Sequence, residues 1–412
     1  MYDVIVVGAR CAGSPTAMLL ARKGHRVLQV EKARFPKDTV STLIIHQPGL
    51  ARLQAWGLLD RVRATGCPPA DRATWDLGSL RLSGSAPPVD GIAELYCPRR
   101  TLLDPILAEA SAEAGAEVRQ GFTVKELVFE EGRVVGTRGR EAGGEVVEDR
   151  ASIVVGADGL RSVVARAVDA PRYNERPPLT SQLYSFYSGV PCDGVEIFVG
   201  DRSGAALLPT NDGLTLVATG WALTRTWDPA STAEDRHAAV LRERPDVAER
   251  VAAGRREERL YGMANIPNFF RTSHGPGWAL VGDAGYHKDP ITAEGITDAF
   301  RDAELLVEAI DAGLTGRVPL DEALATHEQR RNEIAMPLYE FTCNIASMEP
   351  LDARTNVLFQ AISRSQEHTD RFLGIAGGAV HPFEFFSAEN VQRVLADAQS
   401  SEARSAENAS IS

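Results

Sequence analysis

The chain has 412 residues and a formal net charge of -12, with 44 lysines and arginines against 56 aspartates and glutamates. Hydrophobic residues make up 44% and charged residues 24%, a globular composition that excludes disordered and fibrous classes. The acidic balance argues against nucleic acid as a partner, and we expect no signal peptide or membrane span. The five cysteines have no C-x-x-C spacing, so we expect reduced thiols in a cytoplasmic protein and no metal site.

The chain begins with the pattern of a β-α-β unit, with a strand at 2–7, a helix at 12–23 and a second strand at 25–31. The turn VGARCAG, residues 7–13, has Gly8 and Gly13 at the outer positions of the dinucleotide-binding pattern G-x-G-x-x-G. Arg10 occupies the middle position, where a glycine normally stands. Glu31 ends the second strand, where a carboxylate can bind both ribose hydroxyls. A structural turn with a surface glutamate is the alternative.

The later elements change in character along the chain. Helical patterns at 47–62 and 101–114 accompany strand patterns at 93–97, 115–121, 124–147 and 152–156. Residues 180–223 form short aromatic and alternating strands, which indicate an antiparallel sheet with one solvent-exposed face. A strand follows at 278–281, and 296–396 is mostly helical. We therefore expect an α/β protein with a Rossmann-like domain, a mixed antiparallel sheet and a helical C-terminal region.

A second motif, VVGADGLRSVVAR, occupies residues 154–166. The buried strand ends in a turn that carries Asp158 and Gly159 and leads into a helix. This arrangement suits hydroxyl groups and a diphosphate. The alternative is an Asx turn in which Asp158 only caps the helix.

A third motif spans residues 278–306, where a strand is followed by Gly282 and Asp283. A loop closed by Pro290 then leads to Gly295, and a helix begins near Ile296. Backbone donors and the positive end of this helix would face a crevice. Such a helix end stabilises negative charge that develops on a bound ring system.

Together, these three motifs resemble those of the FAD-dependent monooxygenases of the para-hydroxybenzoate hydroxylase type and their relatives, the geranylgeranyl reductases and flavin-dependent halogenases. The resemblance implies FAD as the cofactor, NAD(P)H as the reductant and a discontinuous FAD-binding domain. We expect the FAD-binding domain in residues 1–175 and 261–320, and an antiparallel-sheet substrate domain in 176–260. A helical region would follow in 321–400, with a flexible tail in 401–412.

The resemblance also assigns cofactor contacts. Glu31 would bind the adenosine ribose, Asp158 would lie near the diphosphate, and Asp283 would contact the ribityl and diphosphate region. Arg100, in PRRTLLDPIL, matches an arginine that opens the family's second long helix, although an exposed first-turn residue is the alternative. The N–H groups of Gly295 and Ile296 would face the pyrimidine edge of the flavin. The expected cofactor contacts are Gly8, Arg10, Cys11, Ala12, Gly13, Glu31, Lys32, Arg100, Asp158, Gly159, Gly282, Asp283, Pro290, Gly295 and Ile296.

Several residues depart from the family patterns. Ala293 stands where relatives often have glycine, and Thr297 where they often have asparagine, so the flavin loop is expected to differ in shape. Ser41 and Thr42 replace the Cys-Gly of geranylgeranyl reductases, which weakens the reductase interpretation. The W-x-W-x-I-P signature of tryptophan-type halogenases is also missing.

The resemblance implies a monooxygenase that uses NAD(P)H and O2 to hydroxylate or epoxidise an aromatic, polyketide or other natural-product molecule through a flavin hydroperoxide. An FAD-dependent reductase of an alkene or isoprenoid chain, a flavin-dependent halogenase and a flavin-binding protein without turnover are the alternatives. The enzyme would be a monomer or homodimer.

The substrate is expected between the flavin and the antiparallel sheet. Tyr184, Tyr187 and Trp221 are candidate substrate contacts, although each could instead belong to the core. His287 and His46 are candidate bases, because histidine can deprotonate a phenol near neutral pH. For the neighbouring Lys288 and Asp289, the simple alternative is a solvated ion pair.

Overall fold

The computed structural model describes residues 1–411, and the side chains through residue 400. Its first sheet has the order β17-β18-β8-β1-β2-β5, and the hairpin β6–β7 extends it by pairing with β8. The central pairs β1–β2, β1–β8 and β8–β18 are parallel, as expected for strands buried on both faces. The strands are β1 (Tyr2–Val7), β2 (Val27–Glu31), β5 (Glu117–Gln120), β6 (Phe122–Glu130), β7 (Arg133–Glu141), β8 (Val147–Gly156), β17 (His274–Gly275) and β18 (Trp278–Leu280).

Helices cover this sheet on one face, and the β6–β7 hairpin with α5 (Val163–Ala167) covers the other. The helical face holds α1 (Gly13–Arg22), α4 (Arg100–Glu113) and α8 (Gly295–Leu314), with α2 (Gln47–Ala55) and α3 (Leu59–Arg63) packed behind them. The prediction of one continuous helix at 47–62 is wrong. Gly57 adopts a left-handed φ of 77° and separates α2 from α3.

The second sheet has the order β14-β10-β13-β12-β11-β3-β4, and β15 pairs with β10. The predicted strands of 180–223 are confirmed as antiparallel neighbours, but β3 and β4 also join this sheet through a parallel β11–β3 pair. The strands are β3 (Ala73–Asp76), β4 (Arg81–Gly84), β10 (Thr180–Ser188), β11 (Val195–Val199), β12 (Ser203–Pro209), β13 (Leu214–Ala222), β14 (Arg255–Arg256) and β15 (Tyr261–Met263).

The two faces of the second sheet have different neighbours. α6 (Ala233–Arg242) and α7 (Pro245–Ala253) pack on one face, and the 3-10 turn η1 (Asn211–Gly213) joins β12 to β13. The stretch 93–97, predicted as a strand, makes only isolated bridges at Leu95 and Tyr96. Both residues are buried, so their apolar pattern reflects core packing and not a strand.

A small third sheet, β19-β16-β9, leads from the second sheet back to the first. Its strands are β9 (Arg172–Arg176), β16 (Asn268–Arg271) and β19 (Tyr286–His287). Two 3-10 turns flank β19, namely η2 (Gly282–Ala284) before it and η3 (Pro290–Thr292) after it. The third sequence motif therefore runs from the first sheet to the start of α8.

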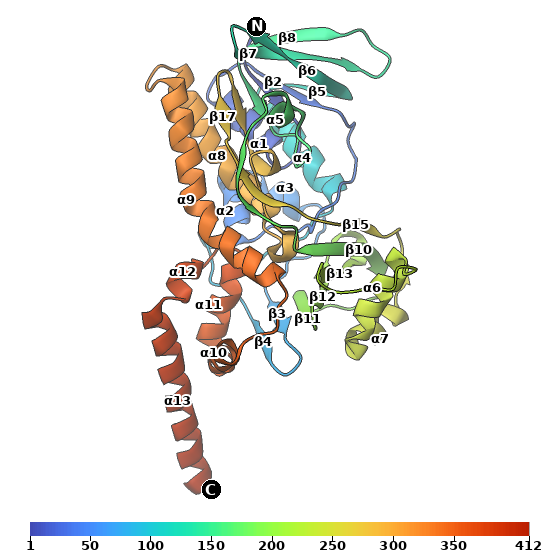
Figure 1. Ribbon diagram of the computed structural model, residues 1–412, viewed down its shortest axis with the longest axis vertical. Coiled ribbons are helices and arrows are strands. Elements are labelled where there is room, and N and C mark those ends of the chain that lie inside the picture. The colour runs from blue at the N-terminus through green and yellow to red at the C-terminus, as the bar shows by residue number, and fades with distance from the viewer. Residues whose placement is uncertain (412) are drawn as a thin grey trace.

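The C-terminal helices are α9 (Leu320–Ala346), α10 (Ala353–Ser363), α11 (Gln366–Ala376), α12 (Pro382–Phe385) and α13 (Ala388–Ile411). Figure 1 shows α10, α11 and β3–β4 close together, and Trp75 and Leu82 of these strands pack in one cluster with Ile362 and Phe372. The α/β class, the two kinds of sheet and the helical C-terminal region are thus confirmed. Residue 412 and the side chains from 401 onward, on which the predicted tail falls, lie outside the described part.

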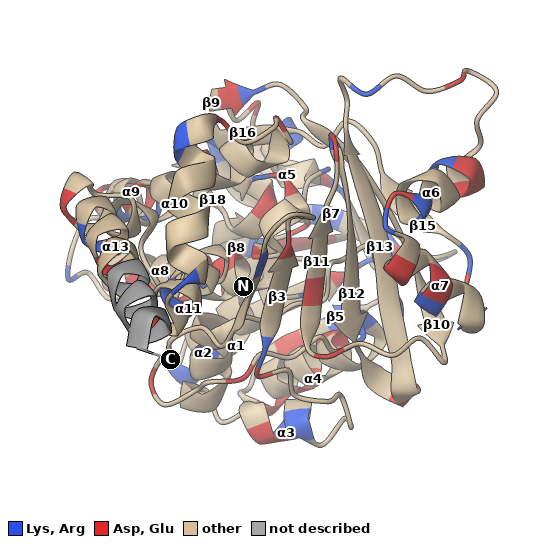
Figure 2. Cartoon of the chain, turned by 90° about the horizontal axis from the view of Figure 1, so that it is seen from below, with Lys and Arg blue, Asp and Glu red and all other residues tan. Residues whose placement is uncertain are grey.

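Charged residues of both signs are spread over most elements (Figure 2). Many of them form surface ion pairs, such as Arg138 of β7 with Glu148 of β8 at 2.9 Å. Within residues 1–411, no helix is sufficiently long and apolar to pass through a membrane.

Candidate active site

The turn between β1 and α1 needs both of its glycines. Gly8 has a φ of 112°, and a Cβ atom on it would lie 2.4 Å from the carbonyl oxygen of Ala157. A Cβ on Gly13 would lie 2.0 Å from the carbonyl oxygen of Gly8. No side chain caps α1, whose N-terminal Ala12 and Gly13 point their N–H groups away from the helix body. The turn can therefore offer backbone donors to an anion.

Glu31 closes the same turn from the end of β2. Its Oε2 accepts a hydrogen bond from the Ala9 N–H at 2.9 Å, and its Oε1 accepts one from the Ala33 N–H at 2.9 Å. The carboxylate is buried, and neighbouring Lys32 is exposed. Each carboxylate oxygen keeps a further acceptor site, which is what a ribose diol requires.

The buried carboxylate of Asp104, on α4, contacts the side chains of Arg10 and Cys11 from the first motif. Asp104 is fully buried, forms an ion pair with Arg10, and accepts from Arg100 Nε at 2.9 Å. The Cys11 thiol also donates to Asp104, at 3.7 Å, and burial raises the pKa of this thiol to about 12. Arg10 further donates to the carbonyl of Lys37 at 3.3 Å. Its side chain therefore points toward α4 and the 35–37 loop and leaves the middle of the turn open.

Arg100 is buried, so the alternative of an exposed first-turn residue is wrong. The pKa of Arg100 lies above its ordinary value, because Cys11, Asp104 and Asp283 raise it more than burial lowers it. Asp283 of the third motif is thus close to Arg100, and it is itself exposed. Gly282, with a φ of 60°, would place a Cβ 2.8 Å from that of Ala12, so the first and third motifs meet.

In the second motif, one carboxylate oxygen of Asp158 caps a helix and the other has no hydrogen-bond partner among the described residues. Asp158 Oδ2 accepts from the Val163 N–H at 2.5 Å, which is the predicted alternative of a capping turn. Its buried Oδ1 has no partner within the described residues, and burial raises the pKa of the carboxyl group. Gly159 has a φ of 76° and open space around it. The capping role and a ligand contact are compatible.

The loop before α8 has the conformation that a glycine would favour. Ala293 adopts a left-handed φ of 56° and ψ of 28°, so the loop keeps this shape at a cost of about 1 kcal/mol. The Thr297 hydroxyl accepts from the His46 N–H at 3.3 Å and thereby ties α8 to α2. A Cβ on Gly295 would meet no atom within 4 Å. Space for a ligand therefore remains at the N-terminus of α8.

The two candidate bases are both buried and fixed by carbonyl groups. His287 Nδ1 donates to the Pro267 carbonyl at 2.6 Å, and its ring stacks on Phe269 with centroids 6.1 Å apart. His46 Nε2 donates to the Thr292 carbonyl at 3.2 Å. Burial lowers the pKa of His46 to about 4, so this ring is neutral near pH 7.

Lys288 and Asp289 are buried and do not pair with each other, so the alternative of a solvated pair is wrong. Lys288 Nζ donates to Glu294 Oε2 at 2.9 Å and also contacts Asp298. Asp289 accepts from the Thr180 hydroxyl at 2.6 Å and from Ile291 N–H at 3.1 Å. Burial raises the pKa of Asp289 to about 6.

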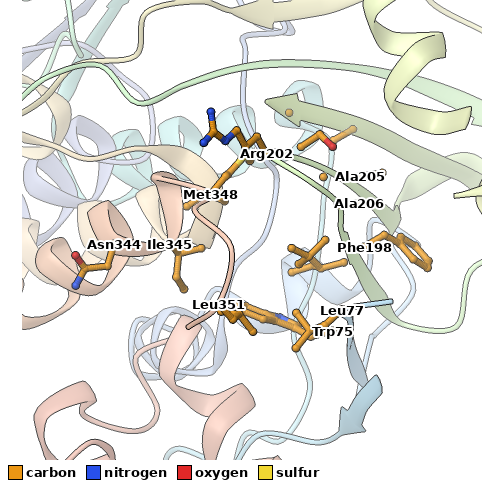
Figure 3. A pocket seen from close by; sticks show the side chains of 18 of the residues that line it. Trp75, Leu77, Phe198, Arg202, Ala205, Ala206, Asn344, Ile345, Met348 and Leu351 are labelled. Atoms are coloured by element: carbon orange, nitrogen blue, oxygen red, sulfur yellow. The ribbon is translucent and has the colours of Figure 1, made fainter. Parts of the chain in front are cut away.

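A cavity of 1770 Å³ lies between the second sheet, the loop before α8 and the C-terminal helices (Figure 3). Its size exceeds the range of about 300–1,000 Å³ that is usual for small-molecule sites. The wall includes Ser41, Thr42, Trp75, Tyr184, Phe198, Ala206, Pro290, Ile291, Ala293, Phe341, Ile345, Met348, Leu351, Phe359 and Phe383. Apolar side chains form much of the wall, which also carries charged residues, among them Arg202, Arg225, Glu340 and Glu349.

Successive side chains of a strand point to opposite faces of the sheet, so the three predicted substrate contacts do not all face the cavity. Tyr184 lines the cavity, and its hydroxyl accepts from the Ser41 N–H at 3.3 Å. Tyr187 packs with Val217 beneath α6 and α7 on the opposite face, and Trp221 lies an even number of residues from Val217 on the same strand. Tyr187 and Trp221 therefore do not line the cavity, contrary to the prediction, because strand neighbours face opposite sides.

Sequence reasoning missed three groups of side chains in the site. Asp104 follows Arg100 by four residues on a helix, a spacing that could have revealed the pair. Glu294 and Asp298 show the same spacing at the start of α8. The cavity residues of β3 and of α9–α12 carry no local motif, so nothing in the sequence linked them to the site.

Comparison with known proteins agrees with this geometry. A family model described as an FAD binding domain matches residues 1–342. The chain belongs to this family. The flavoenzyme is therefore an FAD-dependent oxidoreductase, and its homologues include reductases, monooxygenases and halogenases, as the resemblance implied.

Two relatives illustrate the range of activities. A 6-methylpretetramide 4-monooxygenase from Streptomyces rimosus is 30% identical to the flavoenzyme, over 76% of this chain and 76% of its own. A digeranylgeranylglycerophospholipid reductase from Methanothrix thermoacetophila is 28% identical, over 80% of this chain and 83% of its own. The curated relatives thus span different reactions at similar identity.

Solved structures show the same fold. A flavin-dependent brominase superposes with a TM-score of 0.81 at 18% identity, covering 98% of this chain and 99% of its own. A probable FAD-dependent monooxygenase from Pseudomonas aeruginosa superposes with a TM-score of 0.68 at 23% identity, covering 91% of this chain and 99% of its own. These two likenesses concern the fold alone.

The residues present fit FAD in three respects. The β1–α1 turn brings backbone close to a ligand without a Cβ in the way, the Asp158 Oδ1 acceptor is unpartnered within the described chain, and the N-terminus of α8 has open space at Gly295. Glu31 accepts from the Ala9 N–H of this turn, and Asp283 lies close to Arg100. Ribose and diphosphate groups of a dinucleotide need carboxylates and backbone donors of this kind.

Proposed function

We propose that the flavoenzyme is an NAD(P)H- and O2-dependent monooxygenase that hydroxylates or epoxidises an aromatic, polyketide or other natural-product molecule. The position of the cavity carries this proposal. Pro290, Ile291 and Ala293 belong to the loop that the family resemblance puts beside the flavin ring, and the same residues form part of the cavity wall. The 30% identity to a 6-methylpretetramide 4-monooxygenase supports an aromatic polyketide as the kind of substrate.

In this proposal the protein binds the cofactor along the three motifs. The β1–α1 turn and the unpartnered Oδ1 of Asp158 would contact the diphosphate region. Glu31 would hydrogen-bond to the adenosine ribose, and Asp283 would contact the ribityl region. Arg10 and Arg100, held by Asp104, supply positive charge beside the diphosphate. When bound, FAD that has been reduced by NAD(P)H activates O2 and provides one oxygen atom for the substrate.

The cavity wall positions the substrate and excludes water. Trp75 of β3 and the side chains of Phe341 and Ile345 of α9 line the cavity and belong to one apolar cluster. Apolar walls of this kind hold a large planar or branched molecule by dispersion and keep water from the reacting atoms. Ser41 and Thr42 also line the cavity, and their hydroxyl groups can orient a substrate hydroxyl.

Neither candidate base is among the residues that line the cavity, and of the two we keep His287. Because Nδ1 donates to the Pro267 carbonyl, Nε2 is the lone-pair nitrogen of the neutral ring and can accept a phenolic proton. His46 instead supports the loop by donating to Thr292, and its lowered pKa makes it a poor base near neutral pH. We expect His287→Gln to lower kcat about 100-fold. Substrate-stimulated NAD(P)H oxidation measures this, and unchanged kcat and pH profile would remove His287 from the reaction.

Two alternatives have less support. The structure has Ser41 and Thr42 in the cavity wall, where the resemblance to geranylgeranyl reductases would require a Cys-Gly pair. No lysine of the sequence matches the catalytic lysine of tryptophan-type halogenases. We therefore place the reductase and the halogenase behind the monooxygenase.

The products distinguish these reactions. The holoenzyme is supplied with NADPH or NADH, isotope-labelled O2, bromide and a panel of phenolic polyketides. Incorporation of one labelled oxygen atom supports the monooxygenase. A product that gains two hydrogens without O2 favours the reductase, and a brominated product favours the halogenase. Either of these last outcomes overturns the proposal.

We propose the cytoplasm as the location. All five cysteines are free, and three of them are buried in the core. Unpaired thiols at this number are usual in a reducing compartment. Fractionation of cells that express the tagged full chain would test this.

A further inference from the structure

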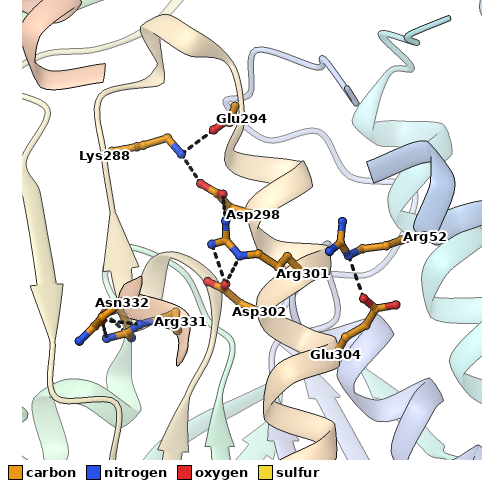
Figure 4. Close-up of polar contacts among 10 residues, drawn as sticks. Arg52, Lys288, Glu294, Asp298, Arg301, Asp302, Glu304, Arg331 and Asn332 are labelled. Carbon is orange, nitrogen blue, oxygen red and sulfur yellow. Dashed lines mark hydrogen bonds and ion pairs between the residues drawn. The ribbon is translucent and has the colours of Figure 1, made fainter. Parts of the chain in front are cut away.

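A chain of buried charges lies behind the flavin loop (Figure 4). Lys288 Nζ donates to Glu294 Oε2 at 2.9 Å and also contacts Asp298. Arg301 then joins Asp298 at 2.7 Å to Asp302 at 2.7 Å. The side chains of Lys288, Glu294 and Asp298 are 5%, 2% and 8% exposed, so water screens them little. Two cations against three carboxylates leave one formal negative charge when all are ionised.

Among these buried charged residues, Glu294 lies nearest in sequence to the N-terminus of α8. It is the N-cap residue of α8 and directly precedes Gly295 and Ile296, whose N–H groups are expected at the pyrimidine edge of the flavin. A helix N-terminus carries a partial positive charge that favours an anion. An ionised carboxylate at the same end offsets that effect, and a protonated one does not.

The neighbours of Glu294 come from four parts of the chain. Lys288 and the ring of Tyr286 lie on the β19 side, and Asp298 and Arg301 lie on α8. His46, at the start of α2, is close enough to feel the charges of Lys288 and Asp298. On the side of α11, a Cβ on Gly378 would lie 3.1 Å from Glu294 Oε1. The carboxyl group is thus enclosed, with Lys288 as its only cationic hydrogen-bond partner among the described side chains.

We propose that Glu294 is a positioning residue that sets the charge at the pyrimidine edge of the bound flavin by taking up or releasing a proton, while Lys288 fixes its side chain. This inference rests on the placement of FAD in the proposed function. It does not depend on whether the reaction is hydroxylation, reduction or halogenation. Glu294 itself makes no contact with the substrate.

The titration of Glu294 falls in a useful range. Burial raises the pKa of its carboxyl group to about 7, although Lys288 pulls in the opposite direction and Asp298 adds to the rise. Below that pH the carboxyl group is neutral and the helix end favours negative charge on the flavin. Above it, the carboxylate opposes that charge. The electron affinity of the flavin should therefore fall as the pH rises through this range.

Sulfite binding to the FAD-loaded protein tests this directly. Sulfite adds to flavin N5, and its electron pair passes into the ring, where the pyrimidine edge becomes negative. At about pH 8.5 we expect Glu294→Gln to bind sulfite about tenfold more tightly than the wild type, from Coulomb's law at ~10 Å and an effective dielectric of ~20. At about pH 6 the two proteins should bind equally. Comparison at each pH cancels the ionisation of sulfite itself.

Two variants serve as controls. Glu294→Asp keeps the charge and should keep the wild-type pH dependence. Glu308→Gln makes the same chemical change further along α8, where the side chain is exposed and pairs with Arg330 at 3.2 Å, and should leave sulfite binding unchanged. Equal affinity of wild type and Glu294→Gln at about pH 8.5, or an equal effect of Glu308→Gln, overturns the inference. Since the readout needs bound FAD alone, failure of the proposed oxygenation leaves it intact.

Discussion

The close contacts in the turn between β1 and α1 are between backbone atoms, whereas the cavity is lined by side chains. A Cβ on Gly13 would lie 2.0 Å from the Gly8 carbonyl, and one on Gly8 would lie 2.4 Å from the Ala157 carbonyl. The cavity wall instead brings together Trp75 of β3 and Ile345 of α9, from segments far apart in the chain. We call the β1–α1 turn with Glu31, Arg100 and Asp104 the cofactor side, and the residues that line the cavity the cavity side. The cofactor side tolerates few residue types, while the residues of the cavity side can vary as long as the shape of the cavity is kept.

The largest effect is expected at Asp104, which belongs to the cofactor side. Asp104→Asn removes the buried negative charge that holds Arg10 and Arg100, and uncompensated buried charge is costly. We expect the free energy of unfolding to fall by about 3 kcal/mol and FAD affinity to fall with it. Denaturant titration and flavin fluorescence measure the two quantities.

Glu113→Gln is the matched control for Asp104→Asn. It lies on the same helix, is 65% exposed and pairs with Arg61 at 2.9 Å. Surface pairs of this kind contribute little, so we expect a change below about 0.5 kcal/mol. Equal stability of the two variants would show that Asp104 does not anchor the cofactor side.

Gly295 separates folding from cofactor binding. Because a Cβ on Gly295 meets no atom within 4 Å, Gly295→Val should leave the stability of the apoprotein within about 0.5 kcal/mol of wild type. A flavin at the N-terminus of α8 would clash with the new side chain, so FAD affinity should fall about 100-fold. Gly295→Ala should have an intermediate effect. Unchanged affinity in the valine variant would place the flavin elsewhere.

A smaller effect is expected on the cavity side. Ala206→Trp fills part of the cavity from β12 (Figure 3) without touching the three motifs. We expect binding of the fluorescent dye anilinonaphthalene sulfonate to weaken about tenfold and FAD affinity to stay the same. Ala253→Trp, at an exposed position of α7, should alter neither. Loss of FAD in the Ala206 variant would mean that the two sides are not independent.

The cofactor side could be predicted in outline because its pattern is local. The strand Tyr2–Val7, the turn with Gly8 and Gly13, and Glu31 are close in the chain, and close backbone approach leaves glycine as the main solution. The interpretation of Arg10 needed the structure. Its partner Asp104 lies on α4, and a side chain that turns toward that helix leaves the middle of the fingerprint free.

The residues that line the cavity, and the buried charges from Lys288 to Asp302, could not be predicted in the same way. The alternating pattern of residues 180–223 indicates strands but does not tell which face is which, so it does not separate Tyr184, which lines the cavity, from Tyr187 and Trp221, which do not. For Lys288 and Asp289, a solvated ion pair is the simple alternative that the sequence leaves open. Burial of Lys288 between Glu294 and Asp298 depends on how α8 packs, which the local sequence does not specify.

The α/β class, the three glycine-containing motifs and the two kinds of sheet can be predicted from the residues, because they follow from strand and helix periods and from backbone positions where only glycine fits. The closure of the cavity by β3, β4 and the C-terminal helices, and the ion pair of Glu294 with Lys288, become visible only in the folded chain. Side-chain contacts between distant segments, and the desolvation of charges that follows, arise only when the whole chain has folded.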